Sequence, residues 1–155
     1  MPIVMNNTIN QIRMVAAGSD DRTIKARRLA ELVQKLGDYR WVGVYDVGPQ
    51  LVSVIAWVGP SAPQFPTFPV SQGLTAAAIQ QKKPIIAGDV RQDPRYLTSL
   101  GNTLSQIIVP VLHPADGSVI GTIDAESERA NAFSSRDQDM IEQCARAALP
   151  LWLLG

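Results

Sequence analysis

The chain has 155 residues, of which 46% are hydrophobic and 18% charged, so it is long enough for one globular domain with its own core. Its 14 basic and 14 acidic residues cancel and form no basic stripe, which argues against nucleic acid as a partner. There is no apolar run of bilayer length, no signal-peptide core and no second cysteine for a disulfide, so we expect a cytoplasmic protein without membrane contact.

The N-terminal third predicts two helices. Residues 6–17 can form a short one, and the second follows a break at 18–21 and runs to about Lys35. Basic residues of the second helix are expected to face solvent: Arg22, Lys25, Arg27 and Arg28. Its apolar residues recur at the i, i+3, i+4, i+7 spacing of one buried face: Leu29, Leu32, Val33 and Leu36.

Two strands, 39–47 and 51–58, are joined by a hairpin turn. Alternate residues of the first strand share one face: Tyr39, Trp41, Gly43, Tyr45 and Val47. Gly43 therefore leaves a position without a side chain between two large rings. Glycine weakens a strand unless a backbone or a ligand comes close, so the pattern predicts either an ordinary aromatic core or an aromatic wall for a ligand.

The middle of the chain, residues 59–104, has only short elements. Four prolines in residues 59–69 predict a loop or a broken edge strand, because proline removes a ladder donor. A short helix at 71–83 and a short strand at 84–90 follow, and 91–104 reads as a loop with about one helical turn. Long loops over a rigid sheet are where ligand sites tend to lie.

The last third predicts a hairpin over 105–127, with Asp116-Gly117 as its turn, and a final helix over 132–152. Ser134 and Asp137 resemble a capping box for that helix, which Pro150 should kink or end. The order of elements predicts a single α+β domain over residues 1–155. Its antiparallel sheet would carry the N- and C-terminal helices on one face and the middle segment on the other.

One face of the final strand is unusually polar for a strand rich in apolar residues. It is formed by Ser118, Ile120, Thr122, Asp124 and Glu126. Two acids at successive positions of one face have two explanations, namely an edge face open to water or a polar wall that receives an ammonium or hydroxyl group of a ligand. His113 and Cys144 lie on different predicted elements, so we expect no metal site and no cofactor. Cys144 falls on the apolar face of the last helix, where cysteines are usually inert.

Several motifs in order resemble the GAF domain, a small-molecule sensing module with a GAF/PAS-like α+β fold. "FPVSQGLTAAAIQQKKPIIAGDVRQDPRY" resembles its Gly-rich turn, helix and strand, although Ser71 replaces the first Gly. "SQIIVPVLHPADGSVIGTIDAESERANAFSSRDQDMIEQCA" resembles its closing hairpin and helix. The resemblance covers roughly residues 20–150.

Within that superfamily the chain looks most similar to the free methionine-(R)-sulfoxide reductases. Trp41 and Tyr45 match their aromatic pair, and Asp124 and Glu126 match their two acids, which the resemblance places in a substrate pocket. The chain departs from the family at the cysteine positions, which carry Thr75 and Ser99, and at the loop glutamate, which is Gln106. A hydroxyl cannot form a sulfenic acid, so the resemblance implies the pocket and argues against the chemistry.

We therefore expect a stand-alone sensor that is not an enzyme, binds an amine, amino acid or similar polar metabolite between the sheet and residues 59–104, and signals through a partner protein in trans. A reductase-like enzyme and a ligand-free dimerisation module remain the alternatives. The expected ligand-binding residues are Trp41, Tyr45, Trp57, Thr75, Tyr96, Ser99, Gln106, Asp124 and Glu126.

Apolar residues at the two ends of the chain also predict a homodimer. At the C-terminus these are Leu149, Leu151, Trp152, Leu153 and Leu154. Four apolar residues of the first helix, named below, join them. Monomers usually avoid large exposed apolar patches, and two-fold pairing would bury both ends in one interface. The additions from the first helix are Ile3, Val4, Ile9 and Ile12.

Overall fold

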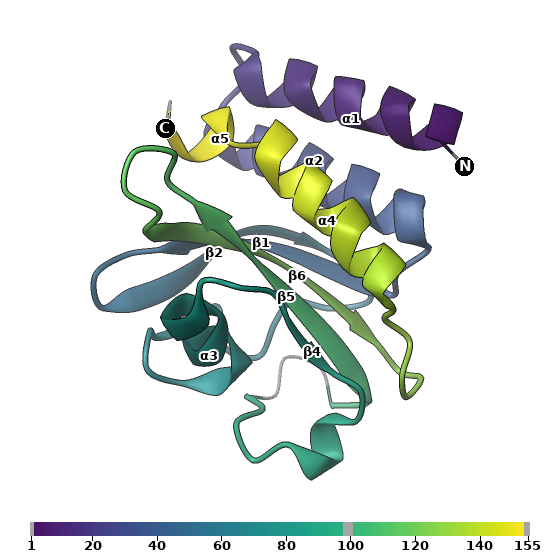
Figure 1. Cartoon of the computed structure of the whole chain (residues 1–155), viewed down its shortest axis with the longest axis vertical. Helices are drawn as coiled ribbons and strands as arrows, with labels where there is room; N and C mark the ends of the chain where they lie inside the picture. The colour runs from purple at the N-terminus through teal and green to yellow at the C-terminus, as the bar shows by residue number, and fades with distance from the viewer. Residues whose placement is uncertain (1, 98–100, 154–155) are drawn as a thin grey trace.

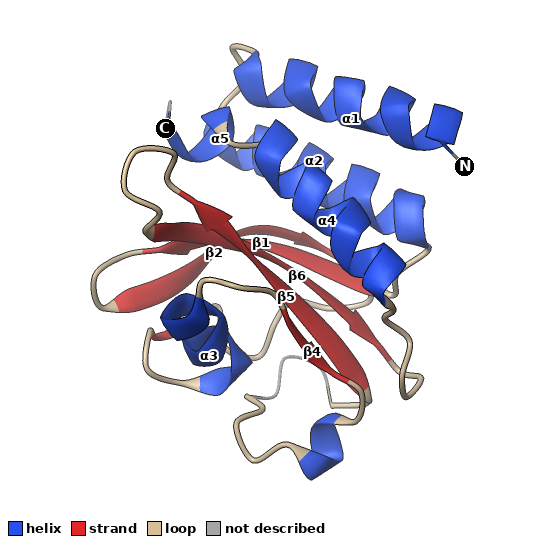
Figure 2. Ribbon diagram, in the orientation of Figure 1, coloured by secondary structure: helices blue, strands red, loops and turns tan. Residues whose placement is uncertain are grey.

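The computed structural model describes residues 2–97 and 101–153, and in it one antiparallel sheet separates a layer of helices from a layer of loops (Figures 1 and 2). The sheet order is β3-β2-β1-β6-β5-β4. Its strands are β1 (Trp41–Val47), β2 (Leu51–Val58), β3 (Thr67–Pro69), β4 (Ile85–Ala87), β5 (Ser105–Leu112) and β6 (Val119–Ser127). The helices are α1 (Pro2–Ala17), α2 (Arg22–Gly37), α3 (Gly73–Gln81), α4 (Ser135–Ala147) and α5 (Pro150–Leu153), with a 3₁₀ turn, η1, at Val90–Gln92.

The predicted α+β architecture is confirmed. Helices α2 and α4 lie against one face of the sheet, α1 lies outside them as a further layer, and α3 with its flanking loops covers the other face (Figure 2). The proline-rich segment supplies β3, a three-residue edge strand, and the last helix ends before Pro150, which begins α5. The Ser134–Asp137 capping box is present at the start of α4.

The main core lies between the sheet and the helices because most residues of β1, β5 and β6 on that face are apolar. Val42, Val44 and Ile123 are fully buried there. Tyr39 also joins this core, where its hydroxyl donates to Asp137 Oδ1 at 2.7 Å. The expectation that Tyr39 shares a face with Trp41 is therefore wrong. Tyr39 precedes β1, so the alternation of side chains along that strand does not decide which way it points. Ile120 likewise packs against this core and not with Asp124.

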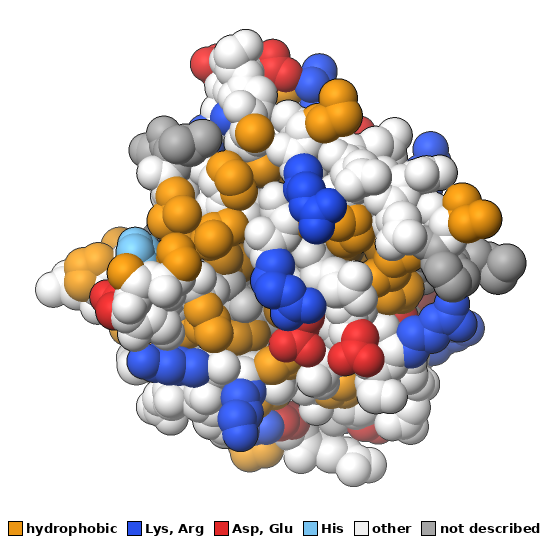
Figure 3. Space-filling model, turned by 45° about the horizontal axis from the view of Figure 1, so that its top comes forward, with side chains coloured by type: hydrophobic (Ala, Val, Ile, Leu, Met, Phe, Trp, Pro, Cys, Tyr) orange, Lys and Arg blue, Asp and Glu red, His pale blue; other side chains and the backbone are white. Residues whose placement is uncertain are grey.

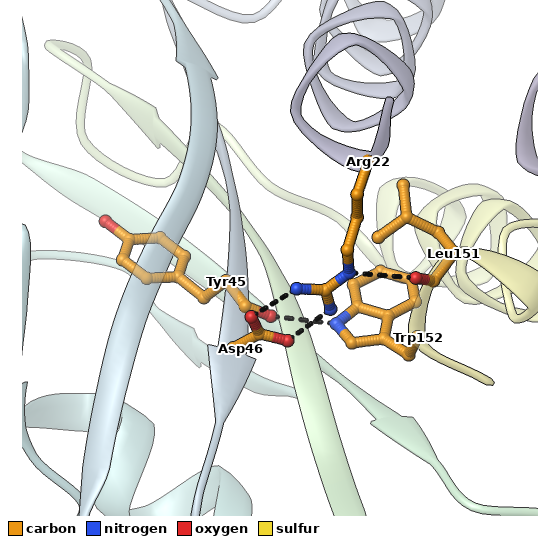
Figure 4. Close-up of polar contacts among 5 residues, drawn as sticks. All are labelled: Arg22, Tyr45, Asp46, Leu151 and Trp152. Carbon is orange, nitrogen blue, oxygen red and sulfur yellow. Dashed lines mark hydrogen bonds and ion pairs between the residues drawn. The ribbon is translucent and has the colours of Figure 1, made fainter. Parts of the chain in front are cut away.

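Two basic residues of α2 do not face solvent as expected. Lys25 is buried, and its Nζ donates to the carbonyl of Ala16 at 3.1 Å, which satisfies an acceptor in the last turn of α1. Arg22 is half-buried, forms a two-point ion pair with Asp46 of β1 and donates to the carbonyl of Leu151 at 3.0 Å (Figure 4). These contacts connect α1, α2 and α5 to each other and to the sheet.

The C-terminal apolar residues pack mostly on their own domain. The expectation that Leu151 and Trp152 belong to an exposed dimerisation patch is therefore wrong. Leu151 is 2% exposed, and Trp152 is half-buried with its Nε1 donating to the carbonyl of Tyr45 at 3.1 Å (Figure 4). Leu153 is exposed, and Leu154 lies outside the described residues. On the helix side of the molecule, hydrophobic side chains are interspersed with charged ones (Figure 3).

Gly121→Ala is expected to lower the free energy of unfolding by about 1–2 kcal/mol, because a Cβ there would stand 2.1 Å from Trp152 Nε1 and break its hydrogen bond. Urea unfolding of the single and double variants measures this. In a Trp152→Ala background the same glycine change should cost almost nothing. Equal costs in both backgrounds would show that Trp152 does not occupy the space over Gly121.

In the part of the chain that the structure describes, no helix is both long enough and apolar enough to cross a membrane.

Candidate functional site

A small, partly enclosed cavity lies on the α3 side of the sheet, opposite the face that α2 and α4 cover. Its volume is about 20 Å³, room for about one water molecule. Polar side chains reach it from four elements: Tyr45 of β1, Thr75 of α3, Gln106 of β5 and Asp124 of β6. The apolar part of the lining comes from Phe65, Phe68, Leu74, Leu97 and Ile108, with Gly73 at the start of α3.

Asp124 is the most unusual group of this cavity. It is 3% exposed, lies opposite Gly43 of β1 and Ile108 of β5, and its Oδ1 accepts no hydrogen bond from any residue that the structure describes. Burial raises the pKa of Asp124 from 3.8 to about 8; the neighbouring Thr122 hydroxyl offsets part of this rise, and the charge of Glu126 adds to it. A carboxyl in such surroundings favours its neutral form unless a cation comes to it.

Tyr45 forms the wall of the cavity beside this carboxyl. Burial, followed by the charges of Asp124 and Glu126, raises the pKa of Tyr45 well above its ordinary value. Its hydroxyl therefore remains protonated and can donate a hydrogen bond to a ligand. Thr75, Gln106 and Asp124 are buried as well, at 3%, 4% and 3% exposed. The cavity thus collects four buried polar side chains, which is more than packing alone requires.

Glu126 has a different environment from Asp124, although the two lie on one face of β6. It is fully buried, and its Oε1 accepts hydrogen bonds from the Tyr96 hydroxyl at 3.2 Å and the Thr103 hydroxyl at 2.7 Å. Neither Glu126 nor Tyr96 lines the cavity as it stands. The edge-face explanation for the two acids is wrong, because β6 is a central strand with both acids buried.

The space over Gly43 is filled by its neighbours. A Cβ at Gly43 would stand 2.3 Å from the Trp41 ring and 2.7 Å from the Tyr45 ring, whose centroids are 6.5 Å apart. Trp41 is completely buried, and its Nε1 donates to the carbonyl of Ser61 at 3.1 Å. The glycine therefore makes room for two packed rings. The expectation of an open aromatic wall at Trp41 is wrong, while Tyr45 does line the cavity.

Of the two remaining expected residues, Trp57 alone is in the described part of the chain, and it lies away from the cavity. Trp57 is half-buried at the rim of the sheet, where Arg27 stands 6.0 Å above its ring and donates to its carbonyl at 3.1 Å. Ser99 lies outside the described residues. Sequence reasoning missed the apolar cover formed by Phe65, Phe68 and Leu97. Only the alternation of "FPTFP", whose last three residues form the edge strand β3, could have indicated part of it.

Residues 20–148 match the family model described as GAF domain. This chain belongs to the GAF domain family. The GAF domain is 25% identical over 138 residues to GAF domain-containing protein A of Dictyostelium discoideum, covering 88% of this chain and 85% of that protein. The sequence-based resemblance to the family is thereby confirmed.

Solved structures similar to this GAF domain include free methionine-R-sulfoxide reductases. The structure of the Neisseria meningitidis enzyme in complex with its substrate has a TM-score of 0.84 at 24% identity. The match covers 96% of this chain and 88% of that enzyme's chain. The structure of the type II enzyme of Thermoplasma acidophilum has a TM-score of 0.73 at 29% identity. The match covers 84% of this chain and 95% of that enzyme's chain.

The single cysteine of this GAF domain lies away from the cavity. Cys144 is completely buried in the core between sheet and helices, on the opposite face of the sheet, and burial raises the pKa of its thiol to about 12. Such a thiol is a poor nucleophile at neutral pH. Within residues 2–97 and 101–153, no three His, Cys, Asp or Glu side chains gather in a way that could hold a metal ion.

Proposed function

We propose that this GAF domain binds a small metabolite with an ammonium group, such as a free amino acid or an amine, at the Asp124 cavity and signals through a partner protein in trans. The observation that carries the proposal is the Asp124 carboxylate oxygen. It is buried and lacks a hydrogen bond among the described residues, yet it faces three other polar side chains. An ammonium group would ionise this carboxyl and donate to it.

The ligand must enlarge the cavity, because about 20 Å³ is far less than an amino acid needs. The layer that has to move is the cover, since the sheet beneath it is fixed by ladder hydrogen bonds. Phe65 is 40% exposed and Leu97 is half-buried, and both belong to loops. Loops positioned on a rigid scaffold are the usual carriers of binding function.

Similarity to free methionine-R-sulfoxide reductases supports an amino acid as ligand, and methionine sulfoxide is the first compound to try. Reduction of that compound is the second candidate function. An assay with free methionine-R-sulfoxide and a thiol reductant separates the two, and we expect no turnover, because Cys144 is buried on the other face. Turnover that disappears in Cys144→Ser would establish the enzyme instead.

A thermal-shift panel of free amino acids, methionine sulfoxide and simple amines tests the proposal. A ligand at one hundred times its Kd should add about 2.7 kcal/mol to the free energy of unfolding. Asp124→Asn should lose most of that ligand-dependent gain, while Asp139→Asn, an exposed acid on α4, should keep it. If no compound of the panel raises the melting temperature of the wild type or of Asp139→Asn, the result would count against the proposal and favour a ligand-free interaction module.

Homodimer formation stays part of the proposal. The exposed apolar side chains of α1, Ile3, Val4 and Met14, are its remaining support. Sedimentation at micromolar concentration should give twice 16.8 kDa. A variant with Ile3, Val4 and Met14 changed to Gln should sediment as a monomer, and an unchanged mass would exclude α1 as the interface.

A further inference from the structure

Helix α5 is attached to the strand that forms the wall of the cavity. Trp152 Nε1 donates to the carbonyl of Tyr45 at 3.1 Å, and Arg22 donates to the carbonyl of Leu151 at 3.0 Å (Figure 4). The same Arg22 side chain forms the two-point ion pair with Asp46. Two consecutive residues of β1 therefore hold α5, the first directly and the second through Arg22.

Tyr45 connects α5 with the cavity because its ring and its carbonyl have different partners. The ring lines the cavity on the α3 side of the sheet, and in Figure 4 it points away from Trp152. The indole of Trp152 packs on the helix side, over Gly121. A displacement of this one residue of β1 would therefore change both the cavity wall and the docking of α5.

The pairing of β1 with β2 is irregular at the same point. Its register shifts between Val44 and Tyr45. Such a bulge interrupts the ladder of hydrogen bonds and often lies next to a functional site, where it re-aims a side chain. The contacts from α2 and α5 thus support β1 where its pairing with β2 is irregular. The ion pair of Arg22 is partly exposed, so we assign it an effect on position and little effect on global stability.

We infer that Trp152 and Arg22 are positioning residues of the ligand cavity: while α5 is docked, they hold the Tyr45 ring in the cavity wall. The consequence for binding rests on the proposed function, since a wall held in place lowers the cost of ordering it around a ligand. Coupling between two sites is reciprocal, so a bound ligand strengthens the docking of α5 in turn. The docking of α5 is then the feature by which a partner protein detects the ligand.

Fluorine NMR of the full chain labelled with 3-fluorotyrosine tests the positioning without any ligand. The sequence has three tyrosines, Tyr39, Tyr45 and Tyr96, and the signal that disappears in Tyr45→Phe belongs to Tyr45. Trp152→Phe keeps an aromatic ring at its position but removes the N–H donor, so the Tyr45 signal should shift and broaden. The signal of Tyr39, which lies in the core on the helix side, should keep its position.

Arg22→Gln should shift the Tyr45 signal as well, and it changes no aromatic ring that could shift the signal directly. Arg27→Gln is the matched control, because it removes a hydrogen bond from the same helix to the carbonyl of Trp57, which does not line the cavity. The control should leave the Tyr45 signal unchanged. Equal changes at Tyr45 and Tyr39 would mean a general loosening of the helix layer and would overturn the inference. An unchanged Tyr45 signal in the first variant would overturn it too.

Binding of methionine sulfoxide separates this inference from the proposed function. Its Kd, measured by calorimetric titration, should rise by about tenfold in Trp152→Phe and stay the same in Arg27→Gln. An equal Kd in the wild type and in Trp152→Phe would overturn the coupling. If no compound of the panel binds while the Tyr45 signal still responds to Trp152→Phe, the proposed function fails and the positioning of the wall is established.

Discussion

Asp124→Asn is expected to be more stable than the wild type at pH 8, by about 2–4 kcal/mol. The wild-type side chain is buried with a pKa of about 8, against 3.8 for the unburied group, so the folded protein retains a proton that the unfolded chain has lost. Its stability therefore falls as the pH rises from about 4 to about 8. Below pH 4 the carboxyl is neutral in both states and the cost disappears.

The size of the effect follows from the width of that window. The free energy of unfolding changes by about 1.4 kcal/mol per pH unit while the folded state holds one extra proton, so about four units amount to roughly 5–6 kcal/mol. Part of this is not recovered by asparagine, because its N–H groups also need partners.

Urea unfolding between pH 5 and pH 8 measures the difference between wild type and Asp124→Asn, with the exposed Asp139→Asn as the control. The gap between wild type and Asp124→Asn should widen steadily with pH, and the control should follow the wild type. A gap that is constant with pH would show that Asp124 is already ionised in the folded protein.

Trp41→Ala should lower the free energy of unfolding by about 3–5 kcal/mol, and Gly43→Ala by about 1–3 kcal/mol. The first change removes a completely buried ring together with its hydrogen bond to Ser61, and the second forces a Cβ to within 2.3 Å of that ring. Both costs follow only if the rings of Trp41 and Tyr45 pack over the glycine as a core.

A double-mutant cycle by chemical denaturation measures the coupling. In the Trp41→Ala background, Gly43→Ala should cost at least about 1 kcal/mol less, because the vacated space accepts the methyl group. Val44→Ala, which removes bulk from the helix side of the same strand, should show no such coupling. Additive costs, or a Gly43→Ala variant as stable as the wild type, would mean that the rings leave an open wall for a ligand.

The fold was predictable because its elements carry local signals. The period of Leu29, Val33 and their neighbours, the Asp116-Gly117 turn and the Ser134–Asp137 cap each specify an element without reference to the rest of the chain. The C-terminus was not predictable in this way. Trp152 looks exposed by sequence, and only Gly121 on a distant strand provides the place where its indole packs.

The candidate site was predictable only as a set of faces. Alternation placed Tyr45 and Asp124 on one side of the sheet, and the structure brings them together with Thr75 and Gln106. The alternation pattern could not show that the Trp41 ring packs over Gly43, because the direction of a side chain depends on its packing. Nor could it separate Asp124 from Glu126, because their difference comes from Thr103 and Tyr96, which no periodic signal connects to β6.

Proton release on binding tests the central claim most directly, namely that a cationic ligand meets the Asp124 carboxyl. Calorimetric titration at pH 7 with methionine sulfoxide, or with the amino acid or amine that stabilises most, in buffers of different ionisation enthalpy, counts the protons released. The carboxyl, with its pKa of about 8, is mostly protonated at that pH, so the wild type should release about one proton per ligand, and Asp124→Asn should release none. Binding without proton release, or release that persists in Asp124→Asn, would contradict the account.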